Sequence, residues 1–128
     1  MKRLVQLFRG GAKRPRIGRL SPHEAHQRVL AKTLALIDVR RPEEWRDSGR
    51  PAGAYGVTLQ DPSFVDKVLN ILSVDRTRAV AVGCKAGPRA AAASTKLGEA
   101  KFSNVSVVVG GFEAGRRDGL PVDRIDDA

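Results

Sequence analysis

The segment from residue 79 to residue 97 restricts the fold of this chain more than any other stretch. A short apolar run at 79–82 is followed by a loop with two glycines, and an alanine-rich stretch starts directly after the loop. A continuous apolar run is typical of a strand buried on both faces, and alanine favours a closely packed helix. The single cysteine of the chain, Cys84, lies where the strand ends. The segment therefore predicts a strand, a tight loop and a helix, with a thiol at the turn.

Similar units recur along the chain. Apolar runs at 34–39 and 104–109 predict two more buried strands, and a shorter strand is expected at 57–59. Helix starts are expected at Ser21-Pro22 and Asp61-Pro62, because a capping side chain before a proline suits the first helical turn. This alternation predicts an α/β fold of three layers, in which helices flank both faces of a mostly parallel central sheet.

The loop that contains the cysteine has the features of an anion-binding site. Gly83 and Gly87 let the backbone curl so that several N–H groups point inward, and the following helix adds the positive end of its dipole. Lys85 and Arg89 add full positive charges. We expect these groups to lower the pKa of the Cys84 thiol, and the thiolate is the nucleophilic form. An inert cysteine packed in the core is the alternative, which a measured pKa near or above about 8.5 would indicate.

This loop resembles the active-site loop of the rhodanese family, Cys-x-x-Gly-x-Arg. The matching residues are Cys84, Lys85, Ala86, Gly87, Pro88 and Arg89. Four residues separate the cysteine from the arginine, whereas tyrosine and dual-specificity phosphatases have five, and by resemblance the shorter loop suits a sulfur atom rather than a phosphate. Residues 38–45 are similar to the family's Asp-Val-Arg-x-Pro-x-Glu-aromatic element, and residues 110–112 to its Gly-Gly-apolar turn. The resemblance runs from about Leu20 to Val122.

Three positions depart from the family's pattern. Arg50 stands where rhodaneses usually have histidine, and Ala90 stands where many have serine. Gly115 stands where the family commonly has tryptophan. The loss of that large side chain predicts a more open pocket near the site.

The resemblance implies a sulfurtransferase. Cys84 would take sulfur from a small anionic donor such as thiosulfate, become a persulfide, and pass the sulfur to a thiol, a protein or cyanide. The N–H groups of the loop would stabilise the persulfide, Lys85 would attract the donor, and Arg89 would bind donor oxygens or brace the loop. Asp38 and Arg40 would support the site through structural hydrogen bonds. No metal or organic cofactor is expected.

Two other functions stay open. The chain could be a non-catalytic rhodanese-fold module that binds or regulates a partner. It could also be a phosphatase or an arsenate reductase that uses the same loop, although the short loop argues against that function. The two histidines, His23 and His26, lie on the first expected helix and are interpreted as surface residues rather than catalytic ones.

The net charge of +9 is concentrated at the N-terminus. Residues 1–20 carry seven basic and no acidic side chains, whereas the rest of the chain carries 16 basic and 14 acidic ones. We therefore expect a basic arm at 1–19, a folded domain at 20–123 and a frayed acidic end at 124–128. Residues 2–19 could contact an anionic surface weakly; nucleic acid is disfavoured because no aromatic residues interleave with the charges.

The single cysteine excludes an internal disulfide and a cysteine-rich zinc site. It fits a reducing compartment, and the apolar runs are too short for a signal peptide or a membrane span. The sequence therefore predicts a cytoplasmic location.

Overall fold

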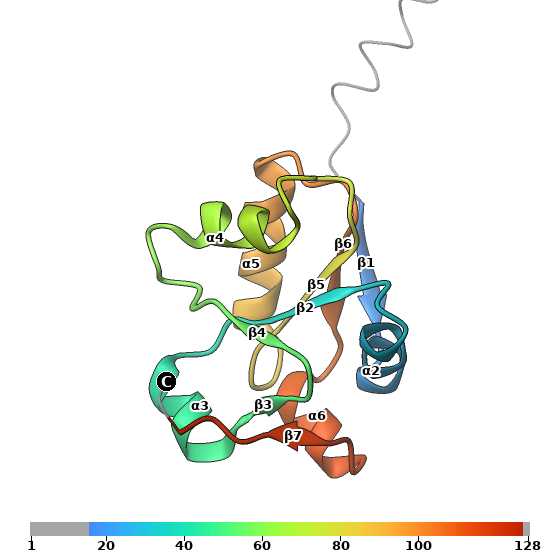
Figure 1. The fold of residues 1–128 in the computed structure, drawn as a ribbon, viewed down its shortest axis with the longest axis vertical. Coiled ribbons are helices and arrows are strands. Elements are labelled where there is room, and N and C mark those ends of the chain that lie inside the picture. The colour runs from blue at the N-terminus through green and yellow to red at the C-terminus, as the bar shows by residue number, and fades with distance from the viewer. Residues whose placement is uncertain (1–15, 127–128) are drawn as a thin grey trace, which may run out of the picture.

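The computed structural model describes residues 16–126 and contains a five-stranded sheet (Figure 1). The order across the sheet is β1-β6-β5-β2-β4, and every neighbouring pair is parallel. The strands are β1 (Ile17–Leu20), β2 (Ala35–Asp38), β4 (Tyr55–Gly56), β5 (Val80–Gly83) and β6 (Val105–Val108). A small antiparallel pair, β3 (Arg50–Pro51) with β7 (Val122–Asp123), lies apart from this sheet.

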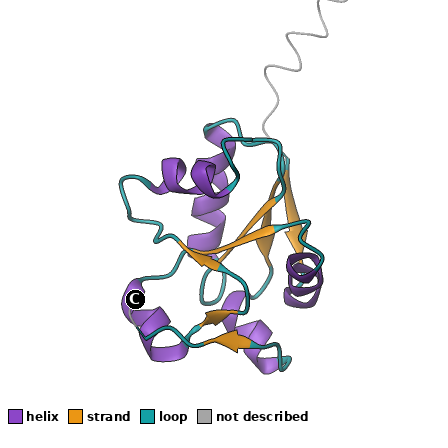
Figure 2. Ribbon diagram, in the orientation of Figure 1, coloured by secondary structure: helices purple, strands orange, loops and turns teal. Residues whose placement is uncertain are grey.

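Helices cover both faces of the sheet, which confirms the predicted three-layer α/β fold (Figure 2). On one face, α4 (Phe64–Ile71) and α5 (Pro88–Glu99) pack against the larger core cluster, which includes Ile37, Val68, Val82, Leu97 and Phe102. On the other face, α2 (Pro22–Leu30) packs against a smaller cluster that contains Ala25, Leu36 and Val108. The remaining described helices are α3 (Pro42–Ser48) and α6 (Gly111–Arg117).

The first helix start and the three long apolar runs are confirmed. Ser21 caps α2 in a reciprocal capping box: the Glu24 N–H donates to Ser21 Oγ at 3.0 Å, and the Ser21 N–H donates to Glu24 Oε1 at 2.9 Å. The strands β2, β5 and β6 lie within a residue or two of their expected bounds. Because each of these signals is local, the sequence alone was sufficient to find them.

Two expected boundaries are wrong. Helix α4 begins at Phe64 rather than at Pro62, because the Asp61 carboxylate accepts the Ser63 N–H at 2.8 Å and holds residues 61–63 in a turn. The short strand lies at Tyr55–Gly56 instead of 57–59. Beyond Gly56 the chain is not a strand, although the Val57 N–H donates to the Asp38 carbonyl, the Leu59 N–H to the Val39 carbonyl and the Thr58 hydroxyl to the Arg40 carbonyl.

All of strand β1 except Leu20 lies inside the expected basic arm, 1–19. Residues Ile17 to Leu20 pair in register with β6, and the Val109 N–H donates to the Leu20 carbonyl at 2.9 Å. The boundary at residue 20 is therefore wrong, and the folded domain includes at least residues 17–19. An edge strand with an exposed glycine and arginine at its centre has no alternating pattern, so periodicity does not reveal it. Most of the predicted anionic-surface segment, 2–15, lies outside the described residues.

No helix within residues 16–126 is long and apolar enough to cross a membrane.

Candidate active site

The cysteine lies at the carboxyl end of β5, at the edge of the sheet where open α/β folds place their sites. Cys84 is only 2 % exposed to solvent. The Gly87 N–H donates to the Cys84 sulfur at 3.1 Å, and α5 begins at the next residue, Pro88. The backbone φ angle at Gly87 is +152°, a value that favours glycine, which explains why the loop has glycine at this position. A backbone amide directed at the sulfur stabilises a negative charge there.

A second contact holds the loop from behind. The Phe112 N–H donates to the Cys84 carbonyl at 2.8 Å, and the Glu113 N–H donates to the Lys85 carbonyl at 3.1 Å. Because C=O and the following N–H point in opposite directions across a trans peptide, the Lys85 and Ala86 N–H groups face away from α6. The first turn of α6 therefore fixes the orientation of the loop amides. Sequence reasoning identified the Gly-Gly turn but not this contact.

Gly111 makes that contact possible. Its φ is +61°, and a Cβ built on it would overlap the Cys84 carbonyl oxygen and lie 2.8 Å from the Lys85 carbonyl oxygen. A side chain at this position is therefore incompatible with the observed docking of the loop on α6.

Arg89 is paired with a carboxylate of α3. Its two terminal nitrogens lie 2.6 and 3.0 Å from the two carboxylate oxygens of Glu44, in a bidentate ion pair. Glu44 Oε1 also accepts the Arg41 N–H at 2.9 Å, so the carboxylate is held by the start of its own helix. Of the two expected roles of Arg89, this geometry matches bracing the loop.

The pair is ionised across the whole neutral range. The hydrogen bond from Arg89 is the main cause that lowers the pKa of Glu44 to about 2. The same hydrogen bond raises the pKa of Arg89, and the nearby Cys84 sulfur adds a smaller effect in the same direction. Glu44 was not among the expected site residues. Its position three residues after the helix cap, in the Pro-x-Glu motif, is the signal that could have indicated it.

Asp38 and Arg40 form a buried ion pair below the loop. The Arg40 side chain donates to both Asp38 oxygens at 2.9–3.1 Å, and their side chains are 3 % and 2 % exposed. Arg40 also donates to Ser48 Oγ and to the Gly49 carbonyl. Its guanidinium carbon lies 4.1 Å from the centre of the Phe112 ring. The pair thus joins the end of β2 to α3 and α6, the two helices that contact the loop.

The other loop side chains lie at the surface. Lys85 is 61 % exposed, and its Nζ lies 3.8 Å from Glu113 Oε2. Ala86 and Pro88 are exposed as well. Within residues 16–126, no three His, Cys, Asp or Glu side chains are grouped so that they could hold a metal ion.

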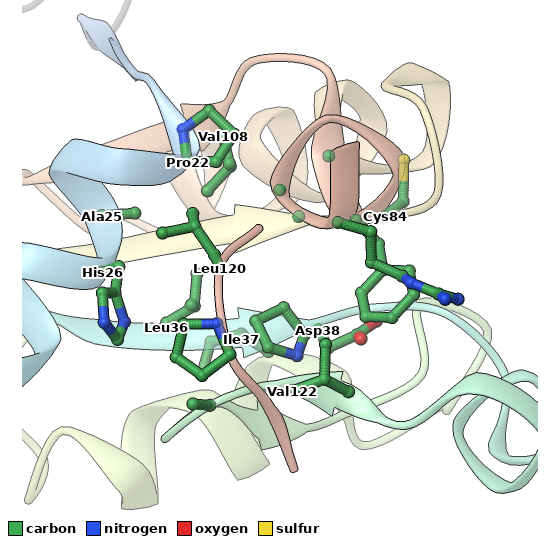
Figure 3. A pocket seen from close by; sticks show the side chains of 18 residues that line it. Pro22, Ala25, His26, Leu36, Ile37, Asp38, Cys84, Val108, Leu120 and Val122 are labelled. Carbon is green, nitrogen blue, oxygen red and sulfur yellow. The ribbon is translucent and has the colours of Figure 1, made fainter. Parts of the chain in front are cut away.

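A cavity of about 40 Å³ lies behind the cysteine loop, between α2, α6 and the segment that follows α6 (Figure 3). Leu36, Leu120 and His26 line it, and the Cys84 sulfur points away from these side chains. His26 is thus partly buried in a cavity wall, whereas His23 is exposed. Gly115 also lines this cavity, as Cys84 does, so the opening expected from the missing side chain adjoins the cysteine, although the sulfur itself points away from Leu36, Leu120 and His26.

Gly115→Ala is expected to raise the free energy of unfolding by about 1 kcal/mol, because alanine is the better helix former and the new methyl adds apolar contacts. The added Cβ would lie 3.6 Å from Pro22 Cβ and 3.8 Å from Leu120 Cδ1, which are ordinary contacts. Urea unfolding measures the change. A lower stability than the parent protein would contradict this packing.

Comparison with known proteins agrees with this geometry. Residues 21–118 match the family model of the rhodanese-like domain. The chain is 34 % identical over 106 residues to thiosulfate sulfurtransferase 16, chloroplastic, of Arabidopsis thaliana, covering 76 % of this chain and 85 % of that protein. It is 31 % identical over 105 residues to the thiosulfate sulfurtransferase GlpE of Actinobacillus succinogenes, covering 81 % and 88 %.

Two solved structures share the fold. The rhodanese-like domain of an Anabaena protein superposes with a TM-score of 0.72 at 23 % identity, over 88 % of this chain and 83 % of that one. The polysulfide-sulfur transferase of Wolinella succinogenes, a homodimer, superposes with a TM-score of 0.68 at 28 % identity, over 87 % and 81 %. The match of residues 21–118 to the family model and the identities to the two sulfurtransferases show that the chain belongs to the rhodanese-like domain family.

Proposed function

We propose that this protein is a sulfurtransferase that moves sulfane sulfur from a donor such as thiosulfate to a thiophilic acceptor through a persulfide on Cys84. The observation that carries the proposal is the Gly87 N–H directed at the Cys84 sulfur, at 3.1 Å, in a loop whose other amides are oriented by α6. Membership of a family with thiosulfate sulfurtransferases among its relatives adds support.

The reaction needs two steps at one atom. The Cys84 thiolate attacks the outer sulfur of thiosulfate, a sulfur–sulfur bond forms, and sulfite leaves with the electrons of the broken bond. A thiolate acceptor then attacks the terminal sulfur of the persulfide and restores the Cys84 thiolate. Loop N–H groups stabilise the persulfide anion between these steps. Because each product leaves before the next substrate reacts, ping-pong kinetics are expected.

The surrounding residues divide into two roles. Lys85, exposed at the rim, attracts the anionic donor, while the N–H groups of the loop from Lys85 to Arg89, with Pro88 lacking one, surround the transferred sulfur. Asp38 and Arg40 position the loop from below, and Arg89 braces it against α3. The acceptor is a low-molecular-weight thiol or a protein thiol. A reduced cysteine is required, so we place the protein in a reducing compartment such as the cytoplasm.

Incubation with thiosulfate followed by intact mass spectrometry tests the proposal. One added sulfur atom is expected on the parent protein and none on Cys84→Ser. Cyanide should remove the added sulfur and release thiocyanate. If no common sulfane donor modifies the parent protein, the chain is not a sulfurtransferase.

The burial of Cys84 favours a second candidate, a non-catalytic module that binds or regulates a partner. At 2 % exposure the residue has the accessibility of a core side chain, and it packs within the larger core cluster. The same mass measurement separates the two functions, because a packed and inert thiol acquires no sulfur. Turnover of a small aryl phosphate would instead indicate a phosphatase.

A further inference from the structure

The charges at the rim of the cysteine loop cancel. Arg89 and Lys85 are the two cationic side chains of the loop, and each lies beside a carboxylate. Glu44 takes both terminal nitrogens of Arg89, and Glu113 lies 3.8 Å from Lys85 Nζ. The four side chains together carry no net charge. An incoming anion therefore meets loop amides and one loosely paired lysine rather than a pair of free cations.

Several hydrogen bonds hold the Glu44–Arg89 ion pair together. Glu44 Oε1 accepts from both Arg41 N–H and Arg89, so the carboxylate cannot rotate away without losing the cap of α3. Bidentate pairing with a carboxylate is the strongest geometry that a guanidinium forms. A donor that used Arg89 would have to displace a carboxylate that its own helix holds in place.

The charge carried by the donor then decides the cost of the first step. The Cys84 thiolate and thiosulfate together bring three negative charges into the loop, and the products, a persulfide anion and sulfite, retain all three. With an organic thiosulfonate, R–SO₂–S⁻, the thiolate attacks the outer sulfur, a sulfinate leaves, and the total is two. With a neutral hydropersulfide, R–S–S–H, a thiolate leaves, the proton stays on the transferred sulfur, and the total is one. The repulsion between like charges grows with the number of charges, and salt screens it less in a partly buried site than at an exposed surface.

We propose that this site prefers sulfane-sulfur donors that carry at most one negative charge, such as organic thiosulfonates and hydropersulfides, over the thiosulfate dianion. The preference follows from the neutralisation of Arg89 by Glu44. It rests on the proposed sulfurtransferase function and names the donor class for the same site.

Thiosulfate and methanethiosulfonate form a matched pair of probes, because a methyl group in one replaces a charged oxygen in the other. We would measure kcat/KM for both donors and divide each by the rate of the same donor with free cysteine. The parent protein is expected to favour methanethiosulfonate by about tenfold or more.

In Glu44→Gln the glutamine still caps α3 but no longer cancels the positive charge of Arg89. The value of kcat/KM for thiosulfate is therefore expected to rise about tenfold, while that for methanethiosulfonate changes much less.

Glu43→Gln is the matched control. It removes the same charge from an exposed carboxylate of the same helix, one residue away, and the donor ratio should remain that of the parent protein. An equal response of the two donors to Glu44→Gln, or the same ratio change in Glu43→Gln, would overturn the proposal.

A salt titration of Lys85→Gln, in which the loosely paired lysine of the rim is removed, gives a second test if Glu44→Gln does not fold. With Arg89 neutralised by Glu44, kcat/KM of this variant for thiosulfate should fall no more steeply with ionic strength than that for methanethiosulfonate. A steeper fall for thiosulfate would mean that a free cation binds it, and the proposal would be wrong. If neither donor adds sulfur to Cys84, the proposed function itself fails, which is a distinct result.

Discussion

Gly111→Ala is expected to slow sulfur transfer to Cys84 by about a hundredfold, the loss typical when a stabilising backbone donor is misplaced. The new methyl would overlap the Cys84 carbonyl oxygen, and it would lie 2.8 Å from the Lys85 carbonyl oxygen. Both carbonyls would have to leave the first turn of α6, and the amides on the opposite side of those peptides would turn with them. The rate of sulfur addition, followed by quenched-flow mass spectrometry, measures the effect.

Gly119→Ala separates the clash from the backbone strain. Gly119 has a φ of +78°, so alanine carries a similar left-handed penalty there, but no atom lies within 4 Å of the added Cβ. Both variants should lose about 1–2 kcal/mol of stability from that strain, and only Gly111→Ala should lose transfer rate. Equal rates in the two variants would mean that docking on α6 does not orient the loop amides.

Short-range patterns were sufficient for most of the fold. The capping box at Ser21, the buried strands and the helix after the cysteine loop each depend on neighbouring residues, so they could be predicted from the sequence. Strand β1 could not, because its place in the sheet comes from pairing with β6, about 90 residues later. Ile17 alone among the first three residues of β1 strongly favours a strand and Gly18 disfavours one, so the tertiary contact decides the structure.

In the candidate site, too, the residues that are adjacent in sequence could be predicted and the contacts between distant residues could not. The cysteine, the glycine and the arginine of the loop are adjacent in sequence and were identified from their spacing. Glu44 lies 45 residues before Arg89, and the carbonyl–amide contact between Cys84 and Phe112 involves no side-chain chemistry. The Cys84–Phe112 contact leaves no local pattern, and the Pro-x-Glu motif that marks Glu44 does not say which side chain Glu44 meets. The Glu44–Arg89 contact sets the charge at the rim, from which the donor preference is proposed, and the Cys84–Phe112 contact sets the direction of the loop amides.

Arg40→Met is expected to lower the free energy of unfolding by about 3–5 kcal/mol, a large part of the stability of a domain this size. The substitution leaves the Asp38 carboxylate buried without its counter-charge. It also removes the donors to Ser48 Oγ and to the Gly49 carbonyl, and the cation above the Phe112 ring. Urea unfolding at neutral pH measures the loss.

The double variant Asp38→Asn/Arg40→Met tests the electrostatic cause of that loss. Asparagine keeps an acceptor for the Arg40 backbone N–H, which donates to Asp38 at 2.9 Å, but it carries no charge. If an unpaired buried charge is the main cost, the double variant should be more stable than Arg40→Met alone. Arg124→Met breaks an exposed pair with Asp126 and should change stability by less than about 1 kcal/mol. A double variant that is no more stable than the single one would assign the loss to packing around Arg40, and the pair would then support the loop by its shape rather than its charge.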